Sequence, residues 1–311
     1  MQAAAMALSC TVCVSAAEDE TIKLTVWGAE EDQDLLKELT DKFQEKYADQ
    51  KFDIQIGVES ESTAKDTILT DVEAGADVYA FADDQLTDLV KAGALLKLDD
   101  YAEALQLVDT TLDDVKAANV EGAIDAASWD SLLEAADKAG KKVGMTLASG
   151  NLVACVSGTW DAITAQDVFG DGYAATKLPT FTVGDKQVQQ GSVAGYKYVG
   201  VNGYSENSGW AVLLAEYFTN EESQQMFFDQ RESGPSNKNV AASDSVQENV
   251  ALAALSAQSE YAQAQKVGGK YWDSAQTFGE LVAQGTLSAD DDNAIQEALD
   301  NLVDGVTAPV E

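Results

Sequence analysis

The sequence predicts an α/β protein in which a mainly parallel sheet is flanked by helices. From residue 21 onward, apolar side chains recur alternately with a period of two and a period of 3.6, which are the periods of strands and helices. The repeated order strand, helix, strand requires right-handed crossovers and so favours parallel strands. With 311 residues, 45% of them hydrophobic and 23% charged, the chain has the length of about two ordinary globular domains.

The first half contains three strand–helix units. In the first strand, Ile22, Leu24 and Val26 point to one side, and the helix after it gathers apolar side chains on one stripe. The predicted strands are residues 21–27, 52–58 and 77–81. The helices after them present, in order, Leu35, Leu36, Leu39, Phe43 and Tyr47, then Ala64, Ile68, Leu69 and Val72, then Leu86, Leu89 and Val90 before Gly93.

The second half repeats this order less regularly. Strands are predicted at residues 152–156 and 194–202, and helices at residues 208–218, 271–285 and 291–303. The acidic run from Asp290 to Asp292 resembles a calcium loop only superficially, because it lacks the glycine and the glutamate spacing of such a loop. These acids are therefore expected at a helix start, where they complement the helix dipole.

The N-terminal segment predicts export. Residues 1–17 carry no charged side chain and form an apolar run that ends at Glu18, as in a signal peptide with a small-residue cleavage site. The alternatives are a buried N-terminal strand and a lipid anchor on Cys10, although the residues before Cys10 match a lipobox poorly. Cleavage would leave Cys155 alone, in an apolar run where it is expected to be a small buried hydrophobe.

The charge balance excludes several classes of function. The chain has 19 Lys and Arg against 54 Asp and Glu, for a net charge of −35, which would repel nucleic acid, anionic lipid and anionic metabolites. Histidine is absent and Arg231 is the single arginine, so that His-dependent catalysis and His-ligated metal sites are excluded. We expect no cofactor, no bound metal and no catalytic residue.

Three of the five tryptophans are candidates for a ligand site. Trp27, Trp160 and Trp272 each lie where a strand or a glycine-containing loop gives way to a helix, which is the usual rim of a crevice in an α/β protein. Aromatic faces beside carboxylates and amides suit a neutral, polyhydroxylated ligand such as a sugar. The alternative is that these rings are ordinary core residues.

Acidic residues follow the first and third strands. Glu30, Glu31 and Asp32 come after the first, and Asp83, Asp84 and Gln85 after the third. In a parallel sheet these segments should meet outside the carboxyl ends of the strands. Acids at these positions also cap or complement a helix start whatever the function, so each is weak evidence alone.

The order of several motifs resembles a known family. The chain carries, in order, "TIKLTVWGAEEDQDLLKELTDKFQEKY", "ADVYAFADDQLTDLVKAGALLKLDDY", "VSGTWDA", "GDGYAATKLPTF", "GSVAGYKYVGVNGYSEN", "LAEYFTNEESQQMFF", "GPSNKNVAAS" and "KYWDSAQTFGELVAQGT". Together they resemble the extracellular solute-binding proteins of carbohydrate ABC importers, of the maltose and maltodextrin-binding type.

This resemblance implies a two-lobed fold of the type II periplasmic-binding-protein kind. The signal peptide would span 1–17, the N-terminal lobe 18–117 and 199–245, and the C-terminal lobe 118–198 and 246–311. Segments usual in relatives are missing after Ser128 and after Asn151, so that the second lobe is expected to be abbreviated.

The resemblance also implies the ligand, the partners and the site. The protein would capture a neutral oligosaccharide between its lobes and deliver it to the permease subunits of an ABC importer. It would act as a monomer outside the cell or in the periplasm, touching the membrane only through the permease or a lipid anchor. Carried over by motif, the ligand contacts are Trp27, Glu31, Asp84, Gln85, Trp160, Tyr196 and Trp272, with Gln85 standing where relatives usually have an arginine.

Other functions stay open from the sequence. The acid excess permits a cationic or peptide ligand. A truncated, non-functional paralogue is consistent with the missing segments. A secreted glycoside hydrolase also combines tryptophan with carboxylates, but the acids fall at helix starts and no catalytic pair stands out.

Overall fold

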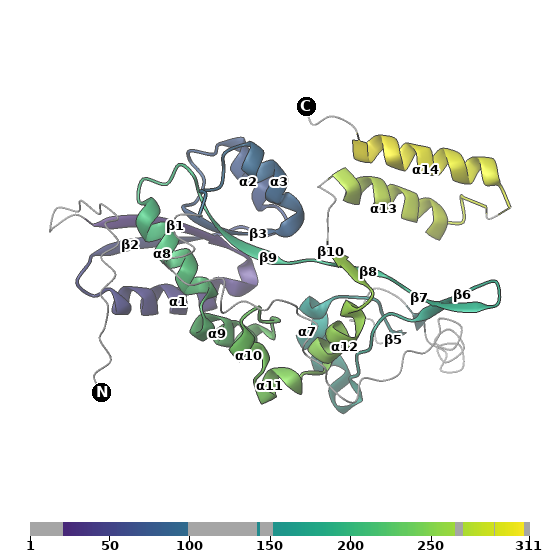
Figure 1. Ribbon diagram of the computed structural model, residues 1–311, viewed down its shortest axis with the longest axis horizontal. Coiled ribbons are helices and arrows are strands. Elements are labelled where there is room, and N and C mark those ends of the chain that lie inside the picture. Colours follow the sequence, from purple (N-terminus) through teal and green to yellow (C-terminus); the bar gives the residue numbers. More distant parts are fainter. Residues whose placement is uncertain (1–20, 99–141, 144–151, 265–269, 289, 308–311) are drawn as a thin grey trace.

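The computed structural model describes residues 21–98, 142–143, 152–264, 270–288 and 290–307 (Figure 1). The proposed signal peptide and both positions of the missing segments fall outside these residues or at their borders. The lobe boundaries stay a prediction. Among the described residues, no helix is long and apolar enough to cross a membrane.

A four-stranded sheet organises the first half of the chain. Its strands are β1 (Ile22–Gly28), β2 (Phe52–Val58), β3 (Val78–Ala82) and β9 (Lys197–Val201), in the order β2-β1-β3-β9. β1 pairs with β2 and β3 in parallel, as the strand–helix order predicts, whereas β9 runs antiparallel to β3. The carboxyl ends of β1, β2 and β3 and the start of β9 therefore share one edge of the sheet.

Helices cover both faces of this sheet (Figure 1). The helices α1 (Gln33–Lys46) and α8 (Ser208–Thr219) lie on one face, and α2 (Ala64–Thr70) and α3 (Leu86–Lys91) on the other. Because side chains alternate along a strand, Ile22, Leu24 and Val26 enter the core beneath α1 and α8, where they are buried. Gly93 ends the segment after α3 with a φ of 71°, a left-handed conformation that suits glycine.

The core on the other face of the sheet, beneath α2 and α3, is smaller and contains two aromatic rings from alternate positions of β3. Tyr79 and Phe81 of β3 are buried there with Ile68 of α2 and Leu89 of α3. The hydroxyl of Tyr79 donates a hydrogen bond to the carbonyl oxygen of Ala94 at 3.1 Å. Each face of the sheet thus has its own apolar layer, as in a sheet covered by crossover helices.

The strand predicted at residues 194–202 is confirmed over residues 197–201, which form β9, but its start is different. Ala194 belongs to a separate short strand, β8 (Ser192–Ala194), which pairs in parallel with β10 (Ala262–Ala264). Gly195 and Tyr196 separate the two strands, so the segment leaves one sheet and enters the other. The strand-like pattern of the run does not reveal this break.

A second body contains short strands and helices of the second half (Figure 1). The strands are β4 (Lys142–Val143), β5 (Leu152–Ala154), the hairpin β6 (Thr180–Val183) and β7 (Lys186–Gln189), and the β8–β10 pair. Its longer helices are α7 (Ala162–Phe169) and α12 (Val250–Ser259). Cys155, expected to be buried, is half-buried, and burial raises the pKa of its thiol.

Three helices link α8 to α12. They are α9 (Glu221–Arg231), α10 (Lys238–Ala241) and α11 (Asp244–Gln247). A small core of Phe228, Val240, Val246 and Leu252 joins α9 through α12. This shared core connects elements on the two sides of the boundary predicted at residue 245.

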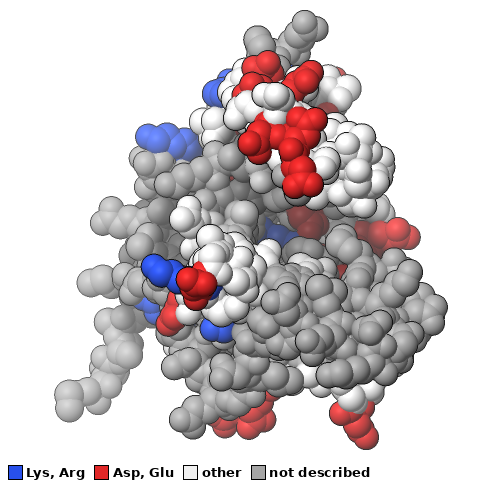
Figure 2. Space-filling model, turned by 90° about the vertical axis from the view of Figure 1, so that its right-hand side faces the viewer, with Lys and Arg blue, Asp and Glu red and all other residues white. Residues whose placement is uncertain are grey.

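The chain ends in an antiparallel helical hairpin. It contains α13 (Lys270–Ala283) and α14 (Asp292–Thr307), and Gly285 after α13 has a φ of 68°. Asp291 accepts a hydrogen bond from the backbone N–H of Ala294 at 3.0 Å, which confirms that this acid caps the start of the last helix. Acidic side chains gather over this hairpin on one face of the molecule (Figure 2).

Candidate ligand-binding site

The turns after the first three strands meet at the carboxyl edge of the sheet. One-turn 3₁₀ helices follow β1 at Glu30–Asp32 and β3 at Asp83–Gln85. Backbone N–H groups tie the edge together: that of Glu59 donates to the carbonyl of Gly28 at 2.9 Å, and that of Asp83 donates to the carbonyl of Tyr196 at 3.0 Å. The segments that the strand order predicts to converge therefore do so.

Asp84 and Trp272 are in direct contact. The indole Nε1–H of Trp272, at the start of α13, donates a hydrogen bond to the Asp84 carboxylate Oδ2 at 3.0 Å. The two residues are 188 positions apart in the sequence. Trp272 is 47% exposed, and the ring of Tyr271 lies 5.1 Å from it, edge to face. A carboxylate and two aromatic rings are thus placed together where solvent reaches them.

A charged network lies beside this pair at the same edge. Arg231 at the end of α9 donates from Nε to Asp32 Oδ1 at 3.1 Å, and Lys197 Nζ lies 2.6 Å from Glu61 Oε1. Burial raises the pKa of Asp32 above its ordinary value, while the charges of Lys197 and Arg231 oppose this rise. The two cations therefore favour the ionised form of a half-buried carboxylate within the acidic turn after β1.

Removing the arginine should make stability depend more strongly on pH. In the variant Arg231→Met, the pKa of Asp32 is expected to rise further, so that the folded state holds its proton to a higher pH than the unfolded state does. Its free energy of unfolding should then fall below the wild-type value by about 1–2 kcal/mol at pH 7, and by less at pH 4, because protonation of Asp32 as the pH falls removes the charge that the arginine stabilises.

Urea denaturation at both pH values measures this difference. The control is Lys37→Met, which removes an exposed partner of Asp41 and should shift stability equally at the two pH values. An Arg231→Met deficit that is the same at pH 4 and pH 7 contradicts the coupling to Asp32.

Gln85, a predicted ligand contact, is buried and makes hydrogen bonds to the backbone. It is 4% exposed, and its Nε2 donates to the carbonyls of Glu61 at 2.8 Å and Ser62 at 2.9 Å. Its Oε1 accepts from the backbone N–H of Lys65 at 3.0 Å. Both amide hydrogens and the amide oxygen are thus used to hold the turn beside Asp84, and the ligand contact of Gln85 stays a prediction.

Trp27 and Glu31 occupy different environments at the same edge. The Trp27 ring is half-buried on the α2 side of the sheet, 6.4 Å from the ring of Tyr79. It packs closely over Gly57, whose missing side chain leaves room for the indole. Glu31 is exposed on the turn after β1. Trp27 is therefore as much a core residue as a rim residue, whereas Glu31 is open to solvent.

Trp160 and Tyr196 are both accessible. Trp160 is 80% exposed and lies in a 3₁₀ turn, Thr159–Asp161, before α7 in the second body. Tyr196 is 44% exposed and joins β8 to β9. The backbone carbonyl of Tyr196 accepts the hydrogen bond from the backbone N–H of Asp83, which places Tyr196 beside the turn after β3. The described contacts do not join Trp160 to the residues of the carboxyl edge.

Sequence reasoning missed three residues of this edge. They are Lys197, Glu61 and Tyr198, which is 40% exposed and whose ring lies 5.6 Å from Phe81. Asp83, whose carboxyl pKa burial raises, is close enough to Tyr198 to raise the pKa of its phenol in addition to burial. The alternation within β9 places Lys197 and Tyr198 on opposite faces, but only the antiparallel pairing with β3 brings both to the carboxyl end.

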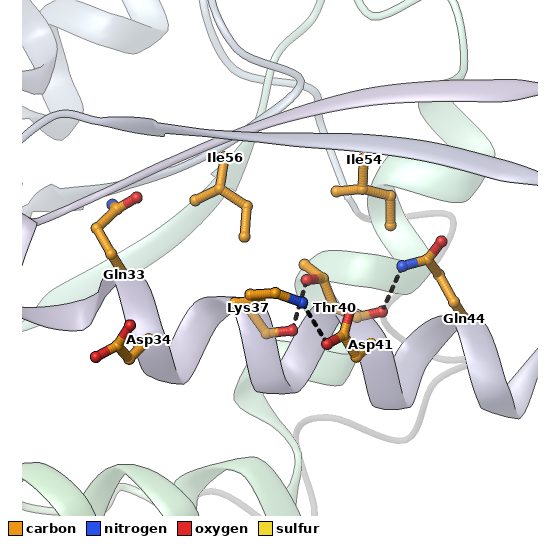
Figure 3. A pocket seen from close by; sticks show the side chains of 8 residues that line it. All are labelled: Gln33, Asp34, Lys37, Thr40, Asp41, Gln44, Ile54 and Ile56. Carbon is orange, nitrogen blue, oxygen red and sulfur yellow. Dashed lines mark hydrogen bonds and ion pairs between the residues drawn. The ribbon is translucent and has the colours of Figure 1, made fainter.

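Two surface hollows are lined by other residues. One, of about 380 Å³, lies between α1 and the outer strand β2 (Figure 3). Ile54 and Ile56 point toward the helix there, and Lys37 and Asp41 form an ion pair of 2.6 Å on its rim (Figure 3). The other, of about 500 Å³, is lined by polar residues including Asp53, Glu73 and Glu206.

Neither hollow contains a predicted site residue. Within the described ranges, no group of three or more His, Cys, Asp or Glu side chains could hold a metal ion.

Part of the chain matches a known family. Residues 141–254 match the model of a family described as bacterial extracellular solute-binding protein. No curated protein sequence gives a significant match to the chain.

Solved structures share the fold over nearly the whole chain. One protein solved with acarbose has a TM-score of 0.73 and 24% identity, covering 93% of this chain and 98% of its own. A maltodextrin-binding protein from L. casei BL23, solved without ligand, has a TM-score of 0.73 and 17% identity, covering 93% and 99%. The GacH receptor of Streptomyces glaucescens, solved unliganded and with acarbose, has a TM-score of 0.72 and 15% identity, covering 94% and 100%.

At these identities the likeness establishes the fold, which is the two-lobed fold of periplasmic binding proteins. The chain thus combines the fold of maltose- and maltodextrin-binding proteins with a segment, residues 141–254, that matches the bacterial extracellular solute-binding family.

Proposed function

We propose that this chain is an extracellular solute-binding protein that captures a neutral, maltodextrin-like oligosaccharide between its lobes and presents it to an ABC importer. The observation that carries the proposal is the pairing of Asp84 with Trp272 at the carboxyl edge of the sheet. The family match and the structurally similar proteins, a maltodextrin-binding protein and a receptor solved with acarbose, support the ligand class.

The chemistry of the paired residues suits a sugar. A carboxylate accepts hydrogen bonds from two adjacent hydroxyls, and an indole covers the apolar C–H face of a pyranose ring. The Asp84 carboxylate already accepts a hydrogen bond from the Trp272 indole, so it is oriented to accept a hydrogen bond from a ligand beside that indole. A sugar hydroxyl would add to that bond or replace it.

The ligand is proposed to be neutral because of the charges at this edge. Glu30, Glu31, Asp83 and Asp84 outnumber the cations, and Lys197 and Arg231 are engaged by Glu61 and Asp32. The net negative charge of this edge would repel an anionic ligand. The one arginine of the sequence, Arg231, is already paired with Asp32.

Binding is proposed to occur without chemical turnover and by closure of two lobes around the sugar. The N-terminal lobe would supply Asp84, Trp27 and Glu31, and the second lobe Trp160. A ligand that touches both lobes binds the closed form more tightly and so shifts the population toward it. The closed form would be the one that permease subunits recognise, with the protein acting as a monomer.

Thermal unfolding with a panel of ligands tests the proposal. Because a ligand that binds only the folded state raises the melting temperature, maltose, maltotriose or a longer α-glucan should raise it, and spermidine or a basic peptide should not. A shift with spermidine or the peptide alone identifies a cation-binding protein. A shift with no saccharide, or release of reducing sugar from starch, contradicts the proposal.

A further inference from the structure

The indole of Trp160 lies directly against the backbone of Gly158. A Cβ atom placed on Gly158 would come within 2.1 Å of Cζ3, 2.3 Å of Cη2 and 2.4 Å of Cε3 of Trp160. All three atoms belong to the six-membered part of the indole, so this ring packs on the α-carbon of the glycine. At the same time Trp160 is 80% exposed, the largest exposed fraction among the described large apolar side chains.

The glycine is required for space and not for backbone conformation. Gly158 has φ −110° and ψ −179°, which is extended backbone that any residue adopts. A side chain at this position therefore does not strain the main chain. It can act only by displacing the indole, because contacts near 2 Å are far inside van der Waals distance.

The turn around the ring is held by its own hydrogen bonds. The backbone N–H of Asp161 donates to the carbonyl of Gly158 at 3.2 Å, and the hydroxyl of Ser157 donates to the Asp161 carboxylate. The turn packs against α7 and α12 of the second body. The backbone beneath the ring is thus fixed on both sides.

We infer that Gly158 is a positioning residue that holds the Trp160 indole as a ligand platform, with one part against the main chain and the rest open to solvent. The inference rests on the proposed function. It adds the role of Gly158, which contacts no ligand itself. Holding the ring in one orientation before binding lowers the entropy that is lost when a sugar stacks on it. Gly158 acts on affinity only through Trp160.

The test compares two alanine variants in the full chain. Gly158→Ala should displace the ring, whereas Gly172→Ala, at a glycine with no atom within 4 Å of its Cβ position and no positive φ, serves as the matched control. The protein is labelled with 5-fluorotryptophan, and the ¹⁹F resonance of Trp160 is assigned by Trp160→Phe. The Trp160 resonance should move in Gly158→Ala and stay in Gly172→Ala, with unchanged melting temperatures in both. An unmoved resonance overturns the inference.

Binding of maltotriose gives the second readout. Gly158→Ala should weaken it about tenfold, comparable to the loss expected from a stacked aromatic contact, and Gly172→Ala should leave it unchanged. In a Trp160→Ala background, Gly158→Ala should have no further effect. An equal loss in both backgrounds, or no loss in the wild-type background, overturns the inference while leaving the proposed function intact. Absence of binding by the wild type contradicts the proposed function instead, and the ¹⁹F result alone then decides whether Gly158 places the ring.

Discussion

Replacing Asp84 with alanine is expected to weaken the binding of maltotriose by about 10- to 100-fold, with little change in stability. A hydrogen bond to a charged group contributes roughly 1.5–3 kcal/mol, and a carboxylate in this position would accept from sugar hydroxyls that are otherwise left unpaired. Asp84 is half-buried on a surface turn and its described side-chain bond is the one from Trp272, so the core does not depend on it. Isothermal titration measures the change in the dissociation constant.

A second acid separates a local contact from the effect of net charge. Asp41→Ala removes the same charge from the same half of the chain, but Asp41 lies on α1 in an exposed ion pair with Lys37. It should bind maltotriose as the wild type does. Equal weakening in both variants, or no weakening in Asp84→Ala, contradicts a ligand contact at Asp84.

Replacing Phe43 with alanine is expected to lower the free energy of unfolding by about 3–5 kcal/mol, as large-to-small changes of buried aromatic residues do. Phe43 is 0% exposed on the inner face of α1. Its ring lies 4.9 Å from Tyr47, 5.5 Å from Phe52 and 5.7 Å from Tyr217, so that one side chain joins α1, β2 and α8. Alanine would leave a cavity among three rings.

Urea denaturation with a common m-value gives this difference. Leu69→Ala is the control, because Leu69 on α2 is 38% exposed and its truncation should cost less than about 1 kcal/mol. A Phe43→Ala variant as stable as Leu69→Ala contradicts the assignment of this ring cluster as the centre of the first core.

The first half of the fold follows closely from local patterns. The predicted strand at residues 52–58 coincides with β2, and those at 21–27 and 77–81 each differ by one residue from β1 and β3. These strands alternate or are continuously apolar between clear helix signals. The apolar side chains that α1 buries, Leu35, Leu36, Leu39 and Phe43, all lie on the predicted stripe. Local sequence suffices here because each element buries one regular face.

Local sequence patterns do not predict contacts between residues that are far apart in the chain. Within residues 194–202, only Ala194 belongs to β8, which pairs with β10, whereas residues 197–201 form β9, which pairs with β3. The burial of Gln85 depends on backbone groups at residues 61–65 that approach only after folding. The Trp272–Asp84 hydrogen bond joins two residues that are 188 positions apart. Nothing in their spacing indicates that they are neighbours; only the family resemblance assigns both to one site.

The crystal structure of the full chain grown with maltotriose tests the central claim most directly. We expect the sugar between the two lobes, with a ring against the indole of Trp160 and a hydroxyl within hydrogen-bond distance of the Asp84 carboxylate. Sugar bound elsewhere, such as in the hollow beside α1, or a site between the lobes that stays without sugar at saturating concentration, would contradict it.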